Sequence, residues 1–135
     1  MSKSEISDLS RINLTDDKDT IANKIKKAKT DALPLPSNIE ELEKRPEAKN
    51  LIGIFSSLAD LTLENSLSEF SGKNFSHFKE ILSQLLIEKI VPISFEIKKL
   101  LNDHNYLDSI LIDGYKKADK IASEKVKKIH KIIGF

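Results

Sequence analysis

The 135-residue sequence contains no cysteine, which excludes a disulfide scaffold and a cysteine-ligated zinc site. The same absence is typical of a chain that works in a reducing cytosol. No apolar run reaches the roughly 18 residues that a membrane span needs. The N-terminus, MSKSEISDLS, lacks the apolar segment of a secretory signal. We therefore expect a cytoplasmic chain with no membrane partner.

Catalytic motifs are also scarce. The three histidines, His77, His104 and His130, are scattered, and none has a second histidine or a carboxylate at a metal-binding spacing. There is no Walker-type phosphate loop and no Gly-x-Ser-x-Gly motif. The net charge of +1 indicates no partner by itself. We expect the histidines to be surface or capping residues, and these motifs alone do not describe a complete enzyme.

The longest apolar pattern lies in residues 76–103, where aliphatic side chains recur every three or four residues. This spacing predicts one long helix with a buried stripe, and Pro92 in its middle predicts a kink. Ser94 lies off the stripe, on the predicted wet side. The stripe consists of Leu82, Leu86, Ile90, Ile93, Ile97 and Leu100.

Capping and breaking residues divide the remaining chain into shorter helices. Asp16 predicts a helix start that leads to a helix ending near Lys29, with Lys24 flanking its apolar stripe. Residues 39–44 predict a single turn, Pro46 opens a helix over 47–59, and Thr62 caps one that ends near Phe70. The expected fold is all-α, a bundle of four or five helices with an irregular N-terminal arm.

The last predicted helix, residues 106–133, has two different faces and ends at Gly134. One face is an apolar stripe that includes Leu107, Ile110, Leu111 and Ile121. The other carries lysines, which suit contact with nucleic-acid phosphates but also suit an ordinary solvated surface near a helix C-terminus. The candidate nucleic-acid-binding residues on this face are Lys116, Lys120, Lys127 and Lys131.

Met1-Ser2-Lys3-Ser4 resembles the end of the Lys-Met-Ser-Lys-Ser signature of class I aminoacyl-tRNA synthetases. The sequences that follow, SRINLTDD at 10–17, KIKKAKTD at 24–31 and EAKNLIGI at 47–54, resemble the bacterial tryptophanyl-tRNA synthetase family. The resemblance continues through Phe78-Lys79, Pro92-Ile93 and residues 122–124, and so covers the whole chain.

The resemblance implies ATP-dependent charging of tRNA(Trp) with tryptophan. It implies that Lys3 is the catalytic lysine that stabilises charge on the ATP phosphates, and that Met1, Ser2 and Ser4 complete the ATP-binding loop. Such a transition state gains charge on its phosphate oxygens, which a mobile lysine can meet. Mg²⁺ is expected from the family, without a metal ligand in this chain.

The first signature lysine, the nucleotide-binding domain and the tryptophan pocket have no counterpart in the sequence. The chain therefore resembles the C-terminal part of a synthetase, with a signature loop and arm at 1–16 and a helical anticodon-binding domain at 17–135 that includes a linker at 30–46. By itself it is expected to be inactive. It is also expected to be monomeric, because the family dimerises mainly through the catalytic domain.

Two other functions remain open at this point. The chain could be a stand-alone helical module that binds tRNA or protein without catalysis. It could also belong to a relative specific for tyrosine, since the pocket that chooses the amino acid is missing. An upstream coding segment that ends in lysine, in frame, would favour the synthetase.

Overall fold

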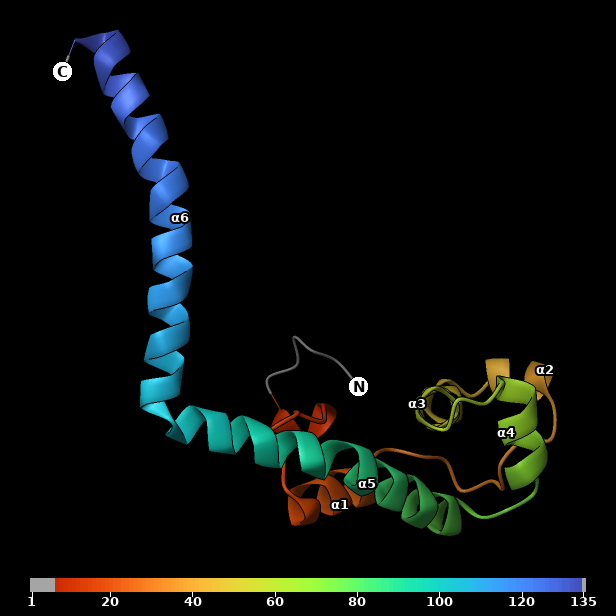
Figure 1. Cartoon of the computed structure of the whole chain (residues 1–135). Coiled ribbons are helices and arrows are strands. Elements are labelled where there is room, and N and C mark those ends of the chain that lie inside the picture. The colour runs from red at the N-terminus through yellow and green to blue at the C-terminus, as the bar shows by residue number, and fades with distance from the viewer. Residues whose placement is uncertain (1–6, 135) are drawn as a thin grey trace. The chain divides into compact units, whose positions relative to one another are not determined.

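The structure is a computed structural model that describes residues 7–134. Within this range it contains one short 3₁₀ turn, six α-helices and no strand, which confirms the all-α class (Figure 1). The number of helices is six rather than the predicted four or five, because residues 39–43, expected as a single turn, form a short helix of their own. The turn is η1 (Asp8–Ser10), and the helices are α1 (Lys18–Lys27), α2 (Ile39–Glu43), α3 (Pro46–Leu58), α4 (Leu63–Phe70), α5 (Phe75–Asn102) and α6 (His104–Ile133).

The helix boundaries follow the capping chemistry of the sequence. Pro46 occupies the first position of α3, and the Thr62 hydroxyl accepts a hydrogen bond from the Asn65 amide at the start of α4. Gly72 and Gly134 adopt positive φ angles of 70° and 85° just beyond α4 and α6. Only glycine takes this conformation without a steric cost, so the predicted helix ends are confirmed.

The start of α1 differs from the prediction by one residue. Asp17, and not Asp16, caps the helix, since its side chain accepts a hydrogen bond from the Thr20 amide. Asp16 is instead buried, at 9% exposure. The two adjacent aspartates are equivalent as caps in the sequence, and only the packing of the preceding segment distinguishes them.

The chain divides into two compact units, residues 1–95 and 96–135, and the division falls within α5. The core of the first unit is built from α1, α2, α3, α4, the linker residue Leu35 and the first half of α5. At its centre Phe55, Phe70 and Phe78 meet edge to face, with ring centroids 4.9 to 5.9 Å apart. These aromatic contacts fasten α3 and α4 to α5.

The linker between α1 and α2 is held to this core at Leu35, whose side chain is 3% exposed. The Leu35 amide donates to the Lys73 carbonyl, and the Leu35 carbonyl accepts from the Gly72 amide. Leu33, by contrast, is 63% exposed, so only Leu35 of these two linker leucines is buried. The Arg45 side chain donates to Asp31 and to the Leu33 and Pro34 carbonyls, which fixes the linker from its other side.

The buried stripe of α5 is shorter than predicted. Leu82 and Leu86 are buried, but Ile93 is 44% exposed and Leu100 is 41% exposed. Ser94, expected on the wet side, is buried instead. The helix does run without interruption through Pro92. The periodicity thus predicted the helix correctly, but it did not predict how much of the apolar stripe is buried.

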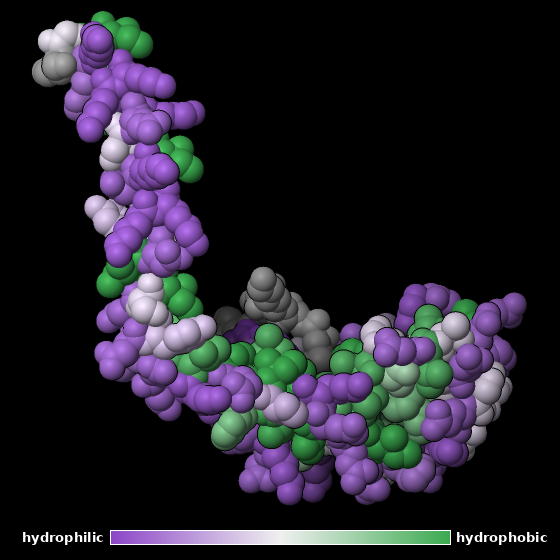
Figure 2. All heavy atoms as spheres, in the orientation of Figure 1, coloured by the Kyte–Doolittle hydropathy of each residue, from purple (hydrophilic) through white to green (hydrophobic). Residues whose placement is uncertain are grey.

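In the second unit, α6 has no buried residue. Its predicted apolar stripe is exposed, with Ile110 at 49%, Leu111 at 69% and Ile121 at 65%. Hydrophilic side chains cover most of α6 in the face shown in Figure 2. No described helix is long and apolar enough to cross a membrane.

Candidate functional site

The segment that follows the signature residues is anchored by a buried lysine. Lys24, on α1, is 3% exposed, and its ammonium group donates to Asp8 and Asp16, with 2.7 Å between Nζ and Oδ2 in each case. Asp8 lies in η1 and Asp16 just before α1, so one side chain ties both ends of the segment to the helix. The sequence placed Lys24 beside the apolar stripe of α1, and it did not predict that the side chain is buried.

Asn13 completes this network from the middle of the segment. Its backbone amide donates to Asp16 at 2.9 Å, and its side-chain amide donates to Asp8 Oδ1 at 3.0 Å. Arg11 pairs with Asp8 Oδ1 at 3.2 Å. Because all of these donors converge on two carboxylates, the path of residues 8–16 is set by polar contacts rather than by regular secondary structure.

The charges in the network stabilise one another. The hydrogen bond from Lys24, with a second from Asn13, lowers the pKa of Asp8 below its ordinary value. Burial alone would lower the pKa of the Lys24 ammonium, but the hydrogen bonds to Asp16 and Asp8 outweigh it and raise that pKa. Lys24 is therefore charged throughout the physiological range, and it is a structural cation rather than a proton donor.

The signature residues themselves, Met1, Ser2, Lys3 and Ser4, lie outside the described residues. Their assigned roles at ATP therefore stay predictions. The structure describes the chain from Ser7 onward, and residues 8–16 lead into α1 along the Lys24 network.

The four candidate tRNA-binding lysines all lie on α6 and are all exposed. Lys116, Lys120, Lys127 and Lys131 are separated by four, seven and four residues, so at 3.6 residues per turn they share one face. Lys117 is beside this face and pairs with Asp113 at 2.7 Å. The face is a row of exposed positive charge, which is the chemistry that nucleic-acid phosphates attract.

The α1 helix offers a second, smaller group of cations. Lys26 and Lys27 are exposed, whereas Lys24 is buried and Lys29 pairs with Glu47 at 3.1 Å. Lys79 lies beside the end of α1 and donates to the Ala28 carbonyl at 2.6 Å, and burial lowers its pKa. Lys24 and Lys79 thus make buried or part-buried contacts within the fold, whereas Lys26 and Lys27 remain exposed.

The histidines are exposed, as predicted, and belong to no cluster. Within residues 7–134 no group of three His, Cys, Asp or Glu side chains could hold a metal ion.

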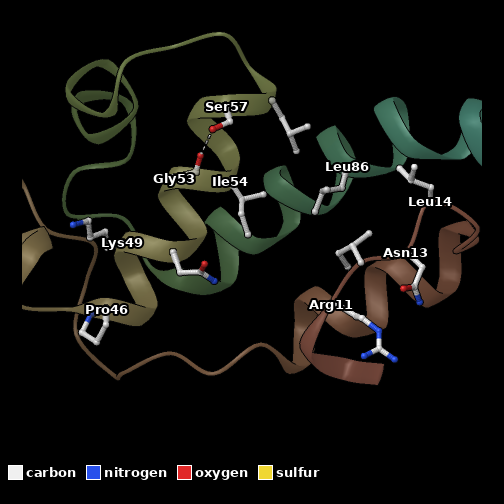
Figure 3. A pocket seen from close by; sticks show the side chains of 12 residues that line it. Arg11, Asn13, Leu14, Pro46, Lys49, Gly53, Ile54, Ser57 and Leu86 are labelled. Carbon is white, nitrogen blue, oxygen red and sulfur yellow. Dashed lines mark hydrogen bonds between the residues drawn. The ribbon is translucent and has the colours of Figure 1, made fainter. Parts of the chain in front are cut away.

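An open apolar groove lies in the first unit, between α3, α5 and residues 11–14 (Figure 3). Its volume is about 1240 Å³. Figure 3 shows Gly53, Ile54 and Ser57 on α3 facing it, with Leu86 on α5 and Leu14 on the N-terminal segment. The sequence gives no local signal of this groove, because residues from three distant segments form it.

An all-helical chain that begins with these signature residues resembles the C-terminal region of a class I aminoacyl-tRNA synthetase. No family model matches the chain. Individual proteins do match it: the chain is 50% identical over 134 residues to the tryptophan–tRNA ligase of Mesorhizobium japonicum, covering 99% of this chain and 38% of that protein.

Two other ligases give the same result. The identity is 49% with the tryptophan–tRNA ligase of Agrobacterium fabrum and 46% with that of Rickettsia conorii, and each match covers 100% of this chain and 38% or 40% of the relative. The chain is homologous to the C-terminal region of the tryptophan–tRNA ligases. It spans about two fifths of the length of these relatives.

Proposed function

We propose that this chain serves as the C-terminal part of a tryptophan–tRNA ligase, where it supplies an ATP-phosphate loop and a helical tRNA-binding region. The observation that carries the proposal is identity of 46 to 50% over the whole chain with three tryptophan–tRNA ligases. All three relatives are named tryptophan–tRNA ligases, which favours tryptophan over tyrosine as the amino acid that is joined to the tRNA.

In this proposal the parent enzyme joins tryptophan to ATP, releases pyrophosphate and transfers the tryptophanyl group to tRNA(Trp). Lys3 donates to the phosphate oxygens as negative charge develops on them, while Met1, Ser2 and Ser4 shape the loop around ATP. The contribution is electrostatic and is largest in the transition state. The anchored segment at 8–16 supports this role, because a loop whose base is fixed loses less entropy when it closes on its ligand.

The lysine face of α6 is the proposed tRNA contact. Phosphate contacts position a nucleic acid without reading its bases, so Lys116, Lys120, Lys127 and Lys131 would orient tRNA(Trp), and anticodon reading would belong to other residues of the helical domain at 17–135. Their exposure and shared face support this proposal.

The test is a fusion enzyme in which this chain replaces the matched C-terminal region of the Mesorhizobium japonicum ligase. We expect the fusion enzyme to catalyse tryptophan-dependent exchange of pyrophosphate into ATP. We expect Lys3→Ala to lower the rate of adenylate formation at least a hundredfold while tryptophan affinity changes little, because one oxyanion-type donor is worth about that much.

The matched control is Lys18→Ala, which removes an exposed lysine at the start of α1. It should leave the exchange rate within twofold of the unchanged fusion enzyme. An inactive fusion enzyme that still binds tRNA would favour a tRNA-binding module without catalysis. Equal losses of rate and tryptophan affinity in Lys3→Ala would argue against the role assigned to Lys3.

A further inference from the structure

Lys24 occupies a position on α1 where a hydrophobic side chain would be expected. It follows Ile21 by three residues and directly precedes Ile25, which are 0% and 1% exposed, and it is buried with them. A buried ion pair is often no more stabilising than apolar side chains of similar volume. Folding stability alone therefore gives no reason for a lysine on this face of α1, and its charge points to a further role.

The two carboxylates that Lys24 holds differ in their burial. The Asp16 side chain is 9% exposed, whereas the Asp8 side chain is 55% exposed. Separating a buried pair leaves an uncompensated charge, but an exposed ion pair contributes little to stability. The pair of Lys24 with Asp16 is thus the fixed part of the anchor, and the Asp8 contact can open without unfolding the core.

Asp8 is the point of the Lys24 network that lies closest in sequence to Lys3. Its carboxylate also accepts from the Asn13 side chain at 3.0 Å and pairs with Arg11 at 3.2 Å. Asp8 follows Lys3 by five residues. A stretch of five residues spans at most about 17 Å, so the position of Asp8 limits the region that Lys3 can reach.

Such a limit matters for a group that acts through its position. The proposed role of Lys3 is to donate to phosphate oxygens as charge develops on them, and this stabilisation depends on where the ammonium group lies in the transition state. A displacement of about 1 Å, caused by a change far from the reacting atoms, can lower a rate by about a hundredfold. A fixed attachment at Asp8 would therefore favour the productive position of Lys3.

We propose that Lys24 is a positioning residue for the formation of tryptophanyl-adenylate, and that it acts on Lys3 through its salt bridge to Asp8. The buried pair with Asp16 fixes the Lys24 ammonium group, and Asp8 fastens the chain that leads to the signature residues onto it. The proposal rests on the proposed function, because it deepens the role given to Lys3. Lys24 itself touches neither ATP nor tryptophan.

The test is Asp8→Asn in the fusion enzyme, because this change spares the buried pair. The asparagine oxygen can still accept from Asn13, but the amide NH₂ that replaces the second oxygen cannot accept from Lys24. We expect the maximal rate of tryptophan-dependent pyrophosphate exchange to fall about tenfold. The unfolding temperature should change little, and the KM for tryptophan should stay within about twofold, which a general weakening of the fold would not produce.

Two variants control for the chemistry of the substitution. Asp8→Glu keeps a carboxylate on an exposed side chain, so it should restore most of the exchange rate. Asp60→Asn makes the same change at an exposed aspartate just beyond α3, and it should leave the exchange rate unchanged. An Asp8→Glu enzyme as slow as Asp8→Asn would contradict the salt bridge as the cause.

A double-mutant cycle with Lys3→Ala shows whether the effect passes through Lys3. If Asp8 acts by positioning Lys3, Asp8→Asn should slow the exchange about tenfold when Lys3 is present and less than about twofold in the Lys3→Ala enzyme. An equal loss in the two backgrounds would overturn the proposal, because Asp8 would then affect the reaction independently of Lys3.

A second variant removes the cation without leaving a buried charge. Lys24→Met combined with Asp16→Asn makes the buried site neutral, and the asparagine oxygen can still accept from the Asn13 amide. This enzyme should fold and yet lose exchange activity to about the same extent as Asp8→Asn, because Asp8 has lost its cation. A folded enzyme that works at the full rate would overturn the proposal.

The outcomes separate the positioning role from the proposed function. An active fusion enzyme whose exchange rate does not respond to Asp8→Asn overturns the positioning role alone. A fusion enzyme without pyrophosphate exchange overturns the proposed function, and the positioning role of Lys24 falls with it.

Discussion

Lys24 is the residue that determines how the N-terminal segment meets the helical core. A buried ammonium group is unfavourable unless carboxylates compensate it, and here Asp8 and Asp16 do so from both ends of one segment. In the sequence, Lys24 is only one of several lysines in the stretch KIKKAKTD. Its function is therefore to hold a segment, and it is withdrawn from any contact with nucleic acid.

Replacing Lys24 should loosen the segment more than it perturbs the core. We expect Lys24→Met to destabilise the chain by about 2–4 kcal/mol, because it leaves the Asp16 carboxylate buried without its cation. Hydrogen exchange should show loss of protection at the Asn13 amide. Urea unfolding of this variant and of Lys26→Met, an exposed neighbour expected to cost less than about 0.5 kcal/mol, gives the comparison.

If Lys24→Met and Lys26→Met unfold at the same urea concentration, the network contributes no net stability. Unchanged exchange at Asn13 in the Lys24→Met variant would mean that the segment is held by its other contacts.

At the scale of the element, the extent of α5 is predicted correctly from the sequence, and yet only part of its apolar stripe is buried. Phe75, Phe78, Leu82 and Leu86 contribute to the core, whereas Ile93 and Leu100 continue the same period and remain exposed. The apolar period of a sequence records what a helix could bury. How much it does bury depends on the elements that cover it.

This difference predicts unequal costs along one helix. Leu82→Ala should cost about 2–5 kcal/mol, since Leu82 is fully buried and its removal leaves a cavity. Ile93→Ala should cost less than about 1 kcal/mol, because that side chain is 44% exposed. Thermal or urea unfolding of the two variants measures both values, and a larger loss for Ile93→Ala would reverse the assignment of the buried face.

The lysine face of α6 is the other element whose role can be tested directly. If it contacts tRNA phosphates, the logarithm of the affinity should fall steeply with the logarithm of salt concentration. Changing Lys120 and Lys127 together to Gln in the fusion enzyme should reduce that slope by about one to two units, because two counterion-releasing contacts are lost. The effect should be similar for different tRNA sequences.

The matched control removes the same charge from positions beside this face. Lys117→Gln with Lys128→Gln should change the slope by less than half as much, and Lys117 already pairs with Asp113. Equal slopes for the unchanged enzyme and the Lys120/Lys127 variant would make this face solvated surface. Lys26 and Lys27 on α1 would then be the next basic residues to test.

At the scale of the whole molecule, the chain matches about two fifths of a ligase, and the greater part of the relatives lies outside the match. We expect the purified 135-residue chain to form no tryptophanyl-adenylate, because one loop cannot bind both ATP and tryptophan. Incubation with labelled ATP and tryptophan, with the fusion enzyme as the positive control, measures this. Adenylate made by the chain alone would contradict it.

The sequence determined the helical class and the helix ends, because caps and breakers act on the backbone within a few residues. Pro46, Thr62 and Gly134 have the positions that local chemistry predicts. It also determined the homology, since the signature residues and the motifs at 10–17, 24–31 and 47–54 are matters of residue identity alone.

The tertiary structure decided which of several similar residues caps a helix, which is buried and which stays exposed. It chose Asp17 over Asp16 as the cap, buried Lys24 among exposed lysines, and left Ile93 exposed while Leu82 was buried. It also brought residues 11–14, α3 and α5 together around Gly53. These outcomes depend on contacts between residues far apart in the chain, and a local pattern of charge or hydrophobicity does not contain that information.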